Sequence, residues 1–299
     1  MSPTIGVFDS GFGGLTVLRA LVARMPAAHY AFIGDTARLP YGSKSQRTIA
    51  RYAVESAQFL VREQGAEFLV IACNTASALA LDAIKEAVPV PVLGVIEPGA
   101  EAARGASHSN DVLVIATDAT VRSHAYKTAC AEHGLRALEK ACPLLVPLVE
   151  EGWTGLDAAG PDATRLDTTG QDAARLAVTD QVIRIYLDEL NAAAAGDGLK
   201  PDTLVLGCTH YPLLRPLIER AVPAGMRVID SAAATAATAA KLILNGTAGG
   251  HAMAVDQEAA RKATEIRCFA TDSVEKFERL GSRFLGRPVG PVKLVDLGG

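Results

Sequence analysis

The hydrophobic and polar positions of the chain predict strands and helices that alternate along most of its length. Short runs of aliphatic and β-branched residues are typical of buried strands, whereas apolar residues that recur every three or four positions indicate helices. Strands are expected at 5–8, 29–33, 68–71, 92–96, 112–116, 203–206, 227–230 and 266–270. Helices are expected after Leu15, at 46–63, 77–87 and 178–195, around Tyr126 and Cys130, after Pro212, at 231–244 and around Phe277. This alternation predicts an α/β fold.

The length and one break in the pattern predict two domains. The 299 residues exceed a typical single domain of about 100 to 150 residues. The alternation pauses at Glu97-Pro98-Gly99, and the last third of the chain resumes the pattern of the first. We therefore predict a first domain from residues 1–97 and 209–299 and a second from residues 98–208. The expected fold is two pseudo-symmetric three-layer α/β domains with parallel-rich sheets and an active site in the cleft between them.

Two segments lack a clear periodic pattern. Residues 142–151 are apolar but contain two prolines, so we expect an edge strand or extended segment that delivers Glu150 and Glu151. Residues near 153–177 are rich in Gly, Ala, Asp and Thr and are expected to form a surface loop.

The amino-acid composition argues against several functional classes of protein. The chain is 49% hydrophobic and 21% charged with a formal net charge of -4, which argues against nucleic acid as a partner. No apolar run reaches the roughly 18 residues that a membrane span requires. The five cysteines are odd in number and have no C-x-x-C spacing, so we expect reduced thiols in a cytoplasmic protein.

Two of the cysteines occur in matching contexts. Cys73 and Cys208 each follow an apolar strand-like run and precede residues with amide or hydroxyl side chains. Each thiol is thus expected at the carboxyl end of a strand, where ligands bind in open α/β sheets and where helix N–H groups stabilise a thiolate. The other three, Cys130, Cys142 and Cys268, are expected to be buried packing residues.

A pair of cysteine thiols can serve several chemistries. A zinc site lacks further ligands near Cys73, so no metal is expected, and a redox dithiol lacks the usual spacing. A cysteine hydrolase built from Cys208 and His210 leaves Cys73 without a role. Inversion of a carbon acid uses two equivalent acid/base groups, one on each face of the substrate, and cysteine can serve as either acid or base.

Five motifs in the same order resemble the glutamate racemase family over nearly the whole chain. They are Asp9-Ser10-Gly11-Phe12-Gly13-Gly14, Pro40-Tyr41-Gly42, Ala72-Cys73-Asn74-Thr75-Ala76-Ser77, Pro147-Leu148-Val149-Glu150 and Gly207-Cys208-Thr209-His210-Tyr211-Pro212. The resemblance implies racemisation of glutamate without a cofactor, for the synthesis of peptidoglycan. It implies that Cys73 handles the proton of D-glutamate and Cys208 that of L-glutamate. The substrate contacts that it implies are Asp9, Ser10, Pro40, Tyr41, Gly42, Asn74, Thr75, Thr117, Thr120, Thr209 and His210.

Charge refines three of these roles. Asp9 beside Cys73 is expected to raise the pKa of the thiol, so Asp9 is assigned to the substrate ammonium group or to proton relay. His210 is expected to assist Cys208, oriented by Glu150 or by the adjacent Glu151. Lys44 lies in a polar loop, so we do not expect it to act as a Schiff-base lysine.

The expected partners are the substrate glutamate and a second copy of the chain in a homodimer. An aspartate racemase of the same superfamily and a catalytically silent amino-acid-binding protein remain the alternatives.

Overall fold

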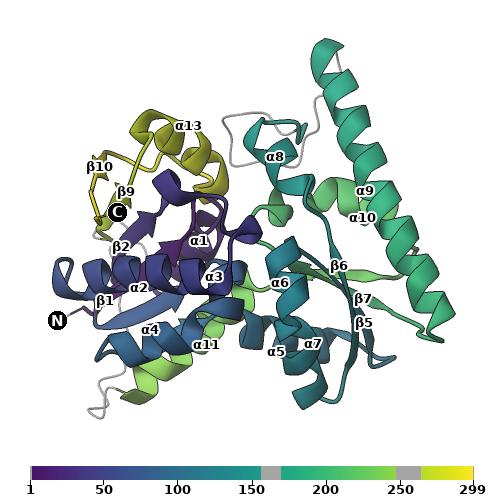
Figure 1. Ribbon diagram of the computed structural model, residues 1–299, viewed down its shortest axis with the longest axis horizontal. Helices are drawn as coiled ribbons and strands as arrows, with labels where there is room; N and C mark the ends of the chain where they lie inside the picture. The colour runs from purple at the N-terminus through teal and green to yellow at the C-terminus, as the bar shows by residue number, and fades with distance from the viewer. Residues whose placement is uncertain (1, 156–169, 247–263, 299) are drawn as a thin grey trace. The chain divides into compact units, whose positions relative to one another are not determined.

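The computed structural model describes residues 2–155, 170–246 and 264–298 (Figure 1). The chain forms two compact units: Met1–Val95 with Ala232–Gly299 make up unit 1, and Ile96–Ser231 make up unit 2. The chain returns to unit 1 at residue 232, later than the residue 209 of the sequence prediction. The reason is that β8 (Arg227–Asp230) pairs with β7 (Thr203–Gly207) and extends the sheet of unit 2.

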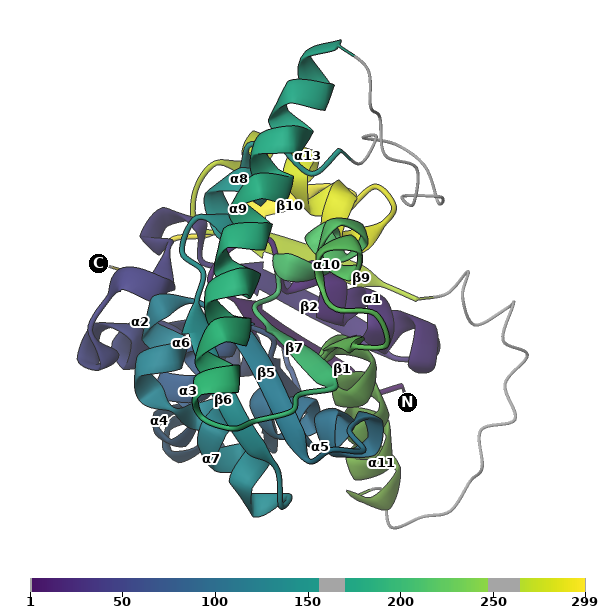
Figure 2. The same ribbon diagram turned by 90° about the vertical axis from the view of Figure 1, so that its right-hand side faces the viewer.

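Unit 1 is a three-layer α/β domain around a six-stranded sheet of order β10-β9-β2-β1-β3-β4, and its described strand pairs are parallel. Helices α2, α3 and α4 cover one face, and α1, α11 and α13 cover the other (Figures 1 and 2). The elements are β1 (Thr4–Asp9), α1 (Leu15–Arg24), β2 (His29–Gly34), η1 (Thr36–Arg38), η2 (Tyr41–Ser43), α2 (Gln46–Arg62), β3 (Phe68–Ile71), α3 (Asn74–Leu79), α4 (Leu81–Ala87), β4 (Val92–Gly94), α11 (Ala232–Gly246), β9 (Ile266–Ala270), α13 (Val274–Leu285) and β10 (Val292–Leu294).

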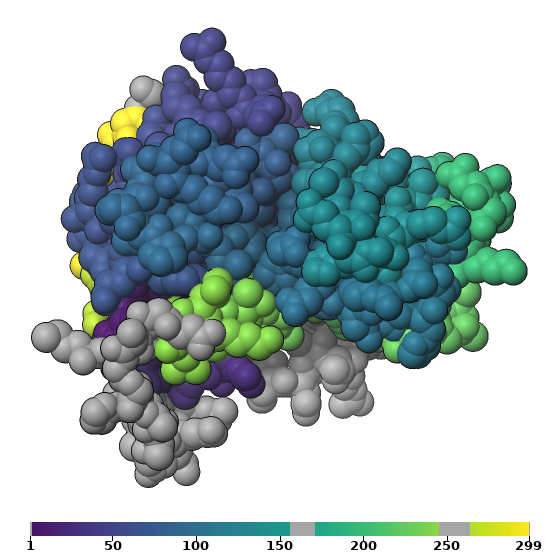
Figure 3. All heavy atoms as spheres, turned by 90° about the horizontal axis from the view of Figure 1, so that it is seen from below, coloured from purple at the N-terminus to yellow at the C-terminus, as the bar shows by residue number. Residues whose placement is uncertain are grey.

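The layers of unit 1 follow from its apolar pattern. All four residues of β3 are buried because helices cover both faces of the parallel sheet, which explains the continuous apolar run. Helix α2 begins where the Ser45 hydroxyl accepts a hydrogen bond from the N–H of Thr48 (3.4 Å). The C-terminal α11 packs on α1, and Figure 3 shows α11 in light green beside the purple N-terminal residues.

Unit 2 is built around a four-stranded sheet of order β6-β5-β7-β8, again with parallel pairs. Helices α5 and α7 cover one face, and α9 and α10 cover the other (Figures 1 and 2). The elements are α5 (Ile96–Ala106), β5 (Asp111–Ala116), α6 (Asp118–Ser123), α7 (Ala125–Glu132), β6 (Arg136–Ala141), α8 (Leu145–Glu150), α9 (Gly170–Gly196), β7 (Thr203–Gly207), η3 (Tyr211–Leu214), α10 (Arg215–Ala221) and β8 (Arg227–Asp230).

The two sheets share one strand order, which confirms the predicted pseudo-symmetry of an α/β protein with parallel sheets. The order β2-β1-β3-β4 of unit 1 corresponds to β6-β5-β7-β8 of unit 2, strand for strand. In this correspondence β3, which precedes Cys73, is equivalent to β7, which precedes Cys208. The two thiols therefore follow the same strand of the common pattern.

The segment 142–151 differs from its prediction. It carries the short helix α8 rather than an extended strand. Pro147 is the third residue of this helix, a position whose N–H has no partner inside the helix, so the proline is tolerated there. The strand of this region is β6 (Arg136–Ala141), which the sequence analysis missed because the segment has neither a continuous apolar run nor a regular alternation of apolar and polar residues.

The segment predicted as a surface loop is also helical in part. Helix α9 begins at Gly170, so the helix starts earlier than the predicted residue 178, and Leu176 on its first turns is buried. Residues 156–169 of the predicted loop lie outside the described residues. The predicted domain break at 97–99 lies in the first turn of α5, a position at which Pro98 is compatible with a helix.

Two further observations bear on the class of protein. All five cysteines are free thiols and all are buried. Across residues 2–155, 170–246 and 264–298, no helix is both long and apolar enough to cross a membrane.

Candidate active site

Cys73 lies where β3 ends and α3 begins, as its sequence context predicts. It is the N-cap residue of α3, and its sulfur accepts a hydrogen bond from the N–H of Ala76 (Sγ to N, 3.5 Å). The thiol also donates to Ser10, which follows β1 (Sγ to Oγ, 3.4 Å). The strand order places β1 directly beside β3, so the first and third motifs meet at one edge of the sheet.

The surroundings of Cys73 keep its thiol protonated. Burial raises the pKa of Cys73 to about 12, and the negative charge of Asp9 raises it as well, while hydrogen bonds from Ser10 and Ala76 act in the opposite direction. Asp9 is fully buried at the end of β1, where its carboxylate accepts a hydrogen bond from the N–H of Gly11 (2.9 Å). The expectation that Asp9 raises the pKa of this thiol is confirmed.

Cys208 has a different neighbour. It follows the last residue of β7 and precedes η3, and its sulfur lies 3.9 Å from Nδ1 of His210. The other ring nitrogen of His210, Nε2, lies 3.2 Å from Oε1 of Glu150 at the end of α8. The geometry therefore selects Glu150 over Glu151, which is exposed to solvent.

The imidazole of His210 is set up to carry a proton. Burial lowers the pKa of His210, but its hydrogen bonds with Cys208 and Glu150 outweigh this effect and raise the pKa to about 10. At neutral pH both ring nitrogens then donate, one toward the sulfur and one toward the carboxylate. His210 is thereby placed to exchange a proton with the sulfur of Cys208.

The turn that carries Cys208 is fixed by buried aromatic residues. The Tyr211 hydroxyl donates to the carbonyl oxygen of Cys142 (3.0 Å), which ties the turn to the segment that leads into α8. A Cβ atom at Gly207 would lie 2.9 Å from the buried ring of Tyr126 and 3.0 Å from Ile115 O. Position 207 therefore requires glycine.

The remaining predicted contacts fall into the two units. Asn74 and Thr75 are buried in the first turn of α3, and Thr209 is buried beside Cys208. Thr117 occupies the N-cap position of α6, but its hydroxyl lies 2.9 Å from that of Thr120 instead of capping the helix. These two threonines follow β5, which is equivalent to the strand β1 that ends at Asp9 and precedes Ser10.

The Pro40-Tyr41-Gly42 motif forms the turn at η2, which contacts α3. The Tyr41 ring is buried and its hydroxyl donates to Asp35 (2.5 Å), so the hydroxyl is engaged within the protein. Pro40 is exposed, and Lys44 donates to its carbonyl oxygen (Nζ to O, 3.3 Å). Asp35 and its partners were missed by the sequence analysis, although Asp35 follows β2 as Asp9 ends β1.

The described residues group no set of three His, Cys, Asp or Glu side chains that could hold a metal ion. In each unit a buried thiol lies close to a further titratable side chain, Asp9 for Cys73 and His210 for Cys208. One thiol is held as an acid beside a carboxylate, and the other lies beside a protonated imidazole. A thiol in such surroundings can act as a general acid or base, so each unit carries one candidate proton-transfer residue.

Comparison with known proteins gives the family. Residues 5–239 match the model of the Asp/Glu/hydantoin racemase family, and the chain belongs to this family. The glutamate racemase of Koribacter versatilis (strain Ellin345) is 49% identical over 310 residues, which cover 99% of this chain and 98% of that protein.

Solved structures agree with the sequence relatives. A glutamate racemase isoform from Bacillus anthracis superposes with a TM-score of 0.80 at 34% identity, covering 99% of this chain and 98% of that one. The glutamate racemase from Francisella tularensis subsp. tularensis SCHU S4 in complex with D-glutamate has a TM-score of 0.79 at 30% identity, with coverage of 99% and 98%.

Proposed function

We propose that the protein is a glutamate racemase that interconverts L-glutamate and D-glutamate by proton transfer between two thiols and Cα, without a cofactor. The observation that carries this proposal is the equivalence of β3 and β7, each followed by a buried cysteine. The similarity to glutamate racemases over nearly the full chain supports glutamate as the substrate and disfavours the aspartate alternative.

In the proposed reaction Cys208 acts first on L-glutamate. The Cys208 thiolate, stabilised by the imidazolium of His210, removes the Cα proton, so a C–H bond breaks and an S–H bond forms. The Cys73 thiol then gives its proton to the opposite face of the carbanion, which yields D-glutamate and a Cys73 thiolate. The reverse reaction exchanges the two roles, and the number of protons on the enzyme is unchanged.

The charged and polar groups around the two thiols fit the proton transfers proposed for them. Cys73 is protonated before the reaction because burial and Asp9 raise its pKa. Once an ammonium group of the substrate lies near Asp9, the carboxylate is neutralised and Cys73 can ionise more readily. Ser10, Asn74, Thr75 and Thr209, together with backbone N–H groups at the helix starts, supply donors for the two substrate carboxylates and for the developing negative charge.

The decisive assay follows hydrogen exchange at Cα. The protein is incubated with L-glutamate in D2O, and the wash-in of deuterium is followed together with the appearance of D-glutamate. A silent amino-acid-binding protein would exchange nothing, which would overturn the proposal. The same preparation is tested with L-aspartate, because faster exchange of aspartate than of glutamate would move the protein to the alternative activity.

The role of each thiol is tested by replacement. Cys73→Ala and Cys208→Ala are each expected to abolish racemisation while circular dichroism shows a folded protein, and Cys130→Ala serves as the control because Cys130 is a buried cysteine on α7. Near-normal turnover by either of the first two variants would remove the two-thiol assignment. A crystal structure with bound glutamate must also place the two sulfur atoms on opposite sides of Cα.

The wider role follows from the same proposal. D-glutamate made in the cytoplasm would supply peptidoglycan synthesis and thereby cell shape. Deletion or depletion of the gene should create a requirement for D-glutamate, and growth without it would contradict this role.

We also propose a homodimer, supported by one face of α9. Val178 and Ile185, two turns apart on this helix, remain 45% and 48% exposed. If two copies of α9 lie antiparallel about Val182, Arg175 of one copy faces Glu189 of the other. Light scattering is expected to give a dimer that Ile185→Asp dissociates, and a monomeric wild type at micromolar concentration would refute it.

A further inference from the structure

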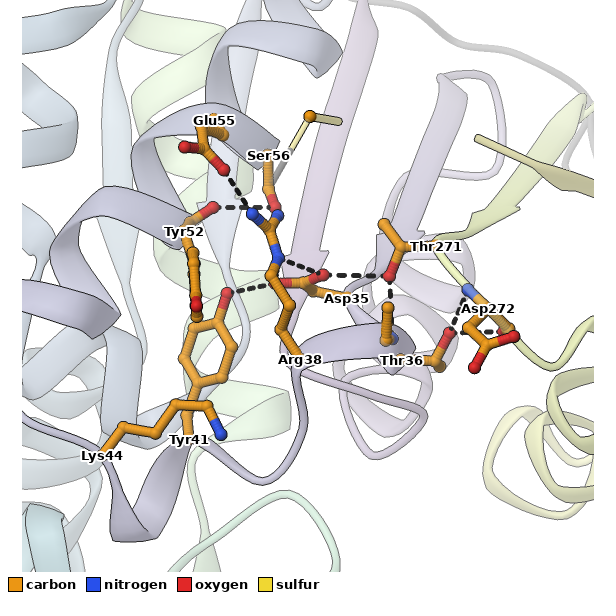
Figure 4. A network of polar contacts seen from close by, with 12 residues as sticks. Asp35, Thr36, Arg38, Tyr41, Lys44, Tyr52, Glu55, Ser56, Thr271 and Asp272 are labelled. Atoms are coloured by element: carbon orange, nitrogen blue, oxygen red, sulfur yellow. Dashed lines mark hydrogen bonds and ion pairs between the residues drawn. The ribbon is translucent and has the colours of Figure 1, made fainter. Parts of the chain in front are cut away.

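A buried carboxylate outside the proposed proton-transfer residues lies at the carboxyl end of β2 (Figure 4). Asp35 has no exposed surface and is held by three side chains. Nε of Arg38 lies 2.9 and 2.8 Å from its two oxygens, the Tyr41 hydroxyl donates over 2.5 Å, and the Thr271 hydroxyl donates over 2.9 Å. Every side-chain oxygen of Asp35 is thus bound by at least two donors.

Arg38 connects this carboxylate to helix α2. Its guanidinium pairs with Glu55 and lies over the ring of Tyr52, 4.2 Å from the ring centroid. Only 13% of the Arg38 side chain is exposed, so the ion pair with Asp35 is largely shielded from water. Loss of one member of such a pair leaves an uncompensated buried charge.

Thr271 connects the same carboxylate to the C-terminal part of unit 1. Its hydroxyl accepts a hydrogen bond from the N–H of Ala37 (2.9 Å) while donating to Asp35. Beside it, the Thr36 hydroxyl donates to the carbonyl oxygen of Asp272 (2.5 Å) and accepts from its N–H (2.9 Å). The loop that leads to the Tyr41 turn is therefore fastened to the residues that follow β9.

The Asp35 network, formed by Asp35 with Arg38, Tyr41 and Thr271, holds the side chain of Tyr41 in place. Its ring is 1% exposed, packs near Phe8 at a centroid distance of 6.1 Å, and belongs to the same apolar cluster as Cys73. Its hydroxyl is bound to Asp35, so the Tyr41 side chain is fixed within unit 1. The direction of the backbone groups of residues 40–42, which the family resemblance assigns to substrate contact, therefore depends on how Tyr41 is held.

We propose that Asp35 is a positioning residue that fixes the 40–42 turn for substrate binding, and that Thr271 controls substrate affinity through Asp35. This inference rests on the proposed function, because it concerns the same substrate site. The network touches none of the atoms that exchange protons. Its loss weakens substrate and transition state equally, which raises KM and leaves kcat unchanged.

The test removes one hydroxyl group. Thr271→Val deletes the hydrogen bond to the charged Asp35 together with the acceptor of the Ala37 N–H. It is expected to raise KM for both enantiomers about tenfold with kcat within about twofold of wild type. Thr271→Ser keeps the hydroxyl and should keep the wild-type KM. Thr235→Val is the matched control, because the buried Thr235 hydroxyl on α11 has no hydrogen-bond partner among the described residues.

A double-variant cycle tests whether the effect passes through Asp35. Tyr41→Phe removes the second hydroxyl, and the KM increase of Tyr41→Phe with Thr271→Val should be smaller than the product of the single increases. An unchanged KM in Thr271→Val, a loss of kcat instead, or independent effects of the two variants would each overturn the inference.

Calorimetric titration with D-glutamate in the Cys208→Ala background, which cannot racemise it, compares the affinity with and without Thr271→Val. It separates failure of this inference, in which the two proteins bind D-glutamate equally, from failure of the proposed function, in which the wild type shows no exchange at Cα.

Discussion

Replacement of Glu150 by glutamine tests the electrostatic basis of the proposed reaction. The exchange keeps an oxygen that accepts from Nε2 of His210 but removes the negative charge 3.2 Å away. The pKa of His210 stands at about 10 against an ordinary 6.5, a preference for the imidazolium worth roughly 5 kcal/mol. One nearby charge commonly accounts for about 1 to 3 pH units of such a shift. Glu150→Gln should therefore lower the pKa of His210 by roughly 1 to 2 pH units.

The consequence is a change in the pH profile. A raised pKa means that the interactions of His210 stabilise the fold fully below pH 6.5 and are lost as the pH rises through about 10. In Glu150→Gln the imidazolium of His210 loses its proton at lower pH. The pH at which kcat/KM falls on the alkaline side should therefore also be lower. At pH 9 the imidazolium fraction, and with it kcat/KM, should fall by about twofold for a shift of 1 pH unit and about tenfold for a shift of 2.

The assay combines polarimetric racemisation between pH 6 and 10 with an NMR titration of the His210 ring. Because L- and D-glutamate are equally stable in water, the equilibrium constant is 1 and kcat/KM must fall by the same factor in both directions. Unequal falls would reveal an error in the measurement. Glu151→Gln is the control, since Glu151 is exposed and adjacent. A titration of His210 that is unchanged in Glu150→Gln, or a larger effect of the control, would refute the reasoning.

Two further predictions concern the surroundings of the thiols. Asp9→Asn removes a charge that raises the pKa of Cys73, so the pH at which Cys73 becomes reactive should fall. The rate of alkylation of the Cys73 peptide, measured against pH, gives this value. An unchanged midpoint of the alkylation profile would contradict the role assigned to Asp9. Gly207→Ala forces a methyl group against Tyr126 and should destabilise the fold by about 1 to 3 kcal/mol in urea unfolding, whereas a stability equal to wild type would show that the ring can move aside.

The strands and the thiol positions could be predicted because they depend on local sequence. The apolar runs before Cys73 and Cys208 are buried on both faces, so their composition alone indicates parallel strands. Cys73 at the start of α3 follows from the polar residues after it. The strand β6 could not be found in this way, since residues Arg136–Ala141 are only partly buried or exposed and carry no continuous apolar run.

Contacts between distant parts of the chain were beyond the sequence pattern. Thr271 reaches Asp35 across 236 positions, and nothing near either residue indicates the other. The choice of Glu150 over Glu151 required the helical geometry of α8, which directs successive side chains about 100° apart. Local patterns therefore located the reactive groups, and the supporting contacts needed the folded chain.

The divided course of unit 1 has a consequence for how the protein is made. Unit 2 is one continuous segment and can complete its sheet as soon as Asp230 has left the ribosome. The sheet that bears the first thiol must wait for β9 and for β10 (Val292–Leu294), which follow unit 2 along the chain. Unit 1 is thus begun before unit 2 and finished after it, so a chain broken off between unit 2 and β9 has the whole sheet that carries the second thiol and only part of the sheet that carries the first.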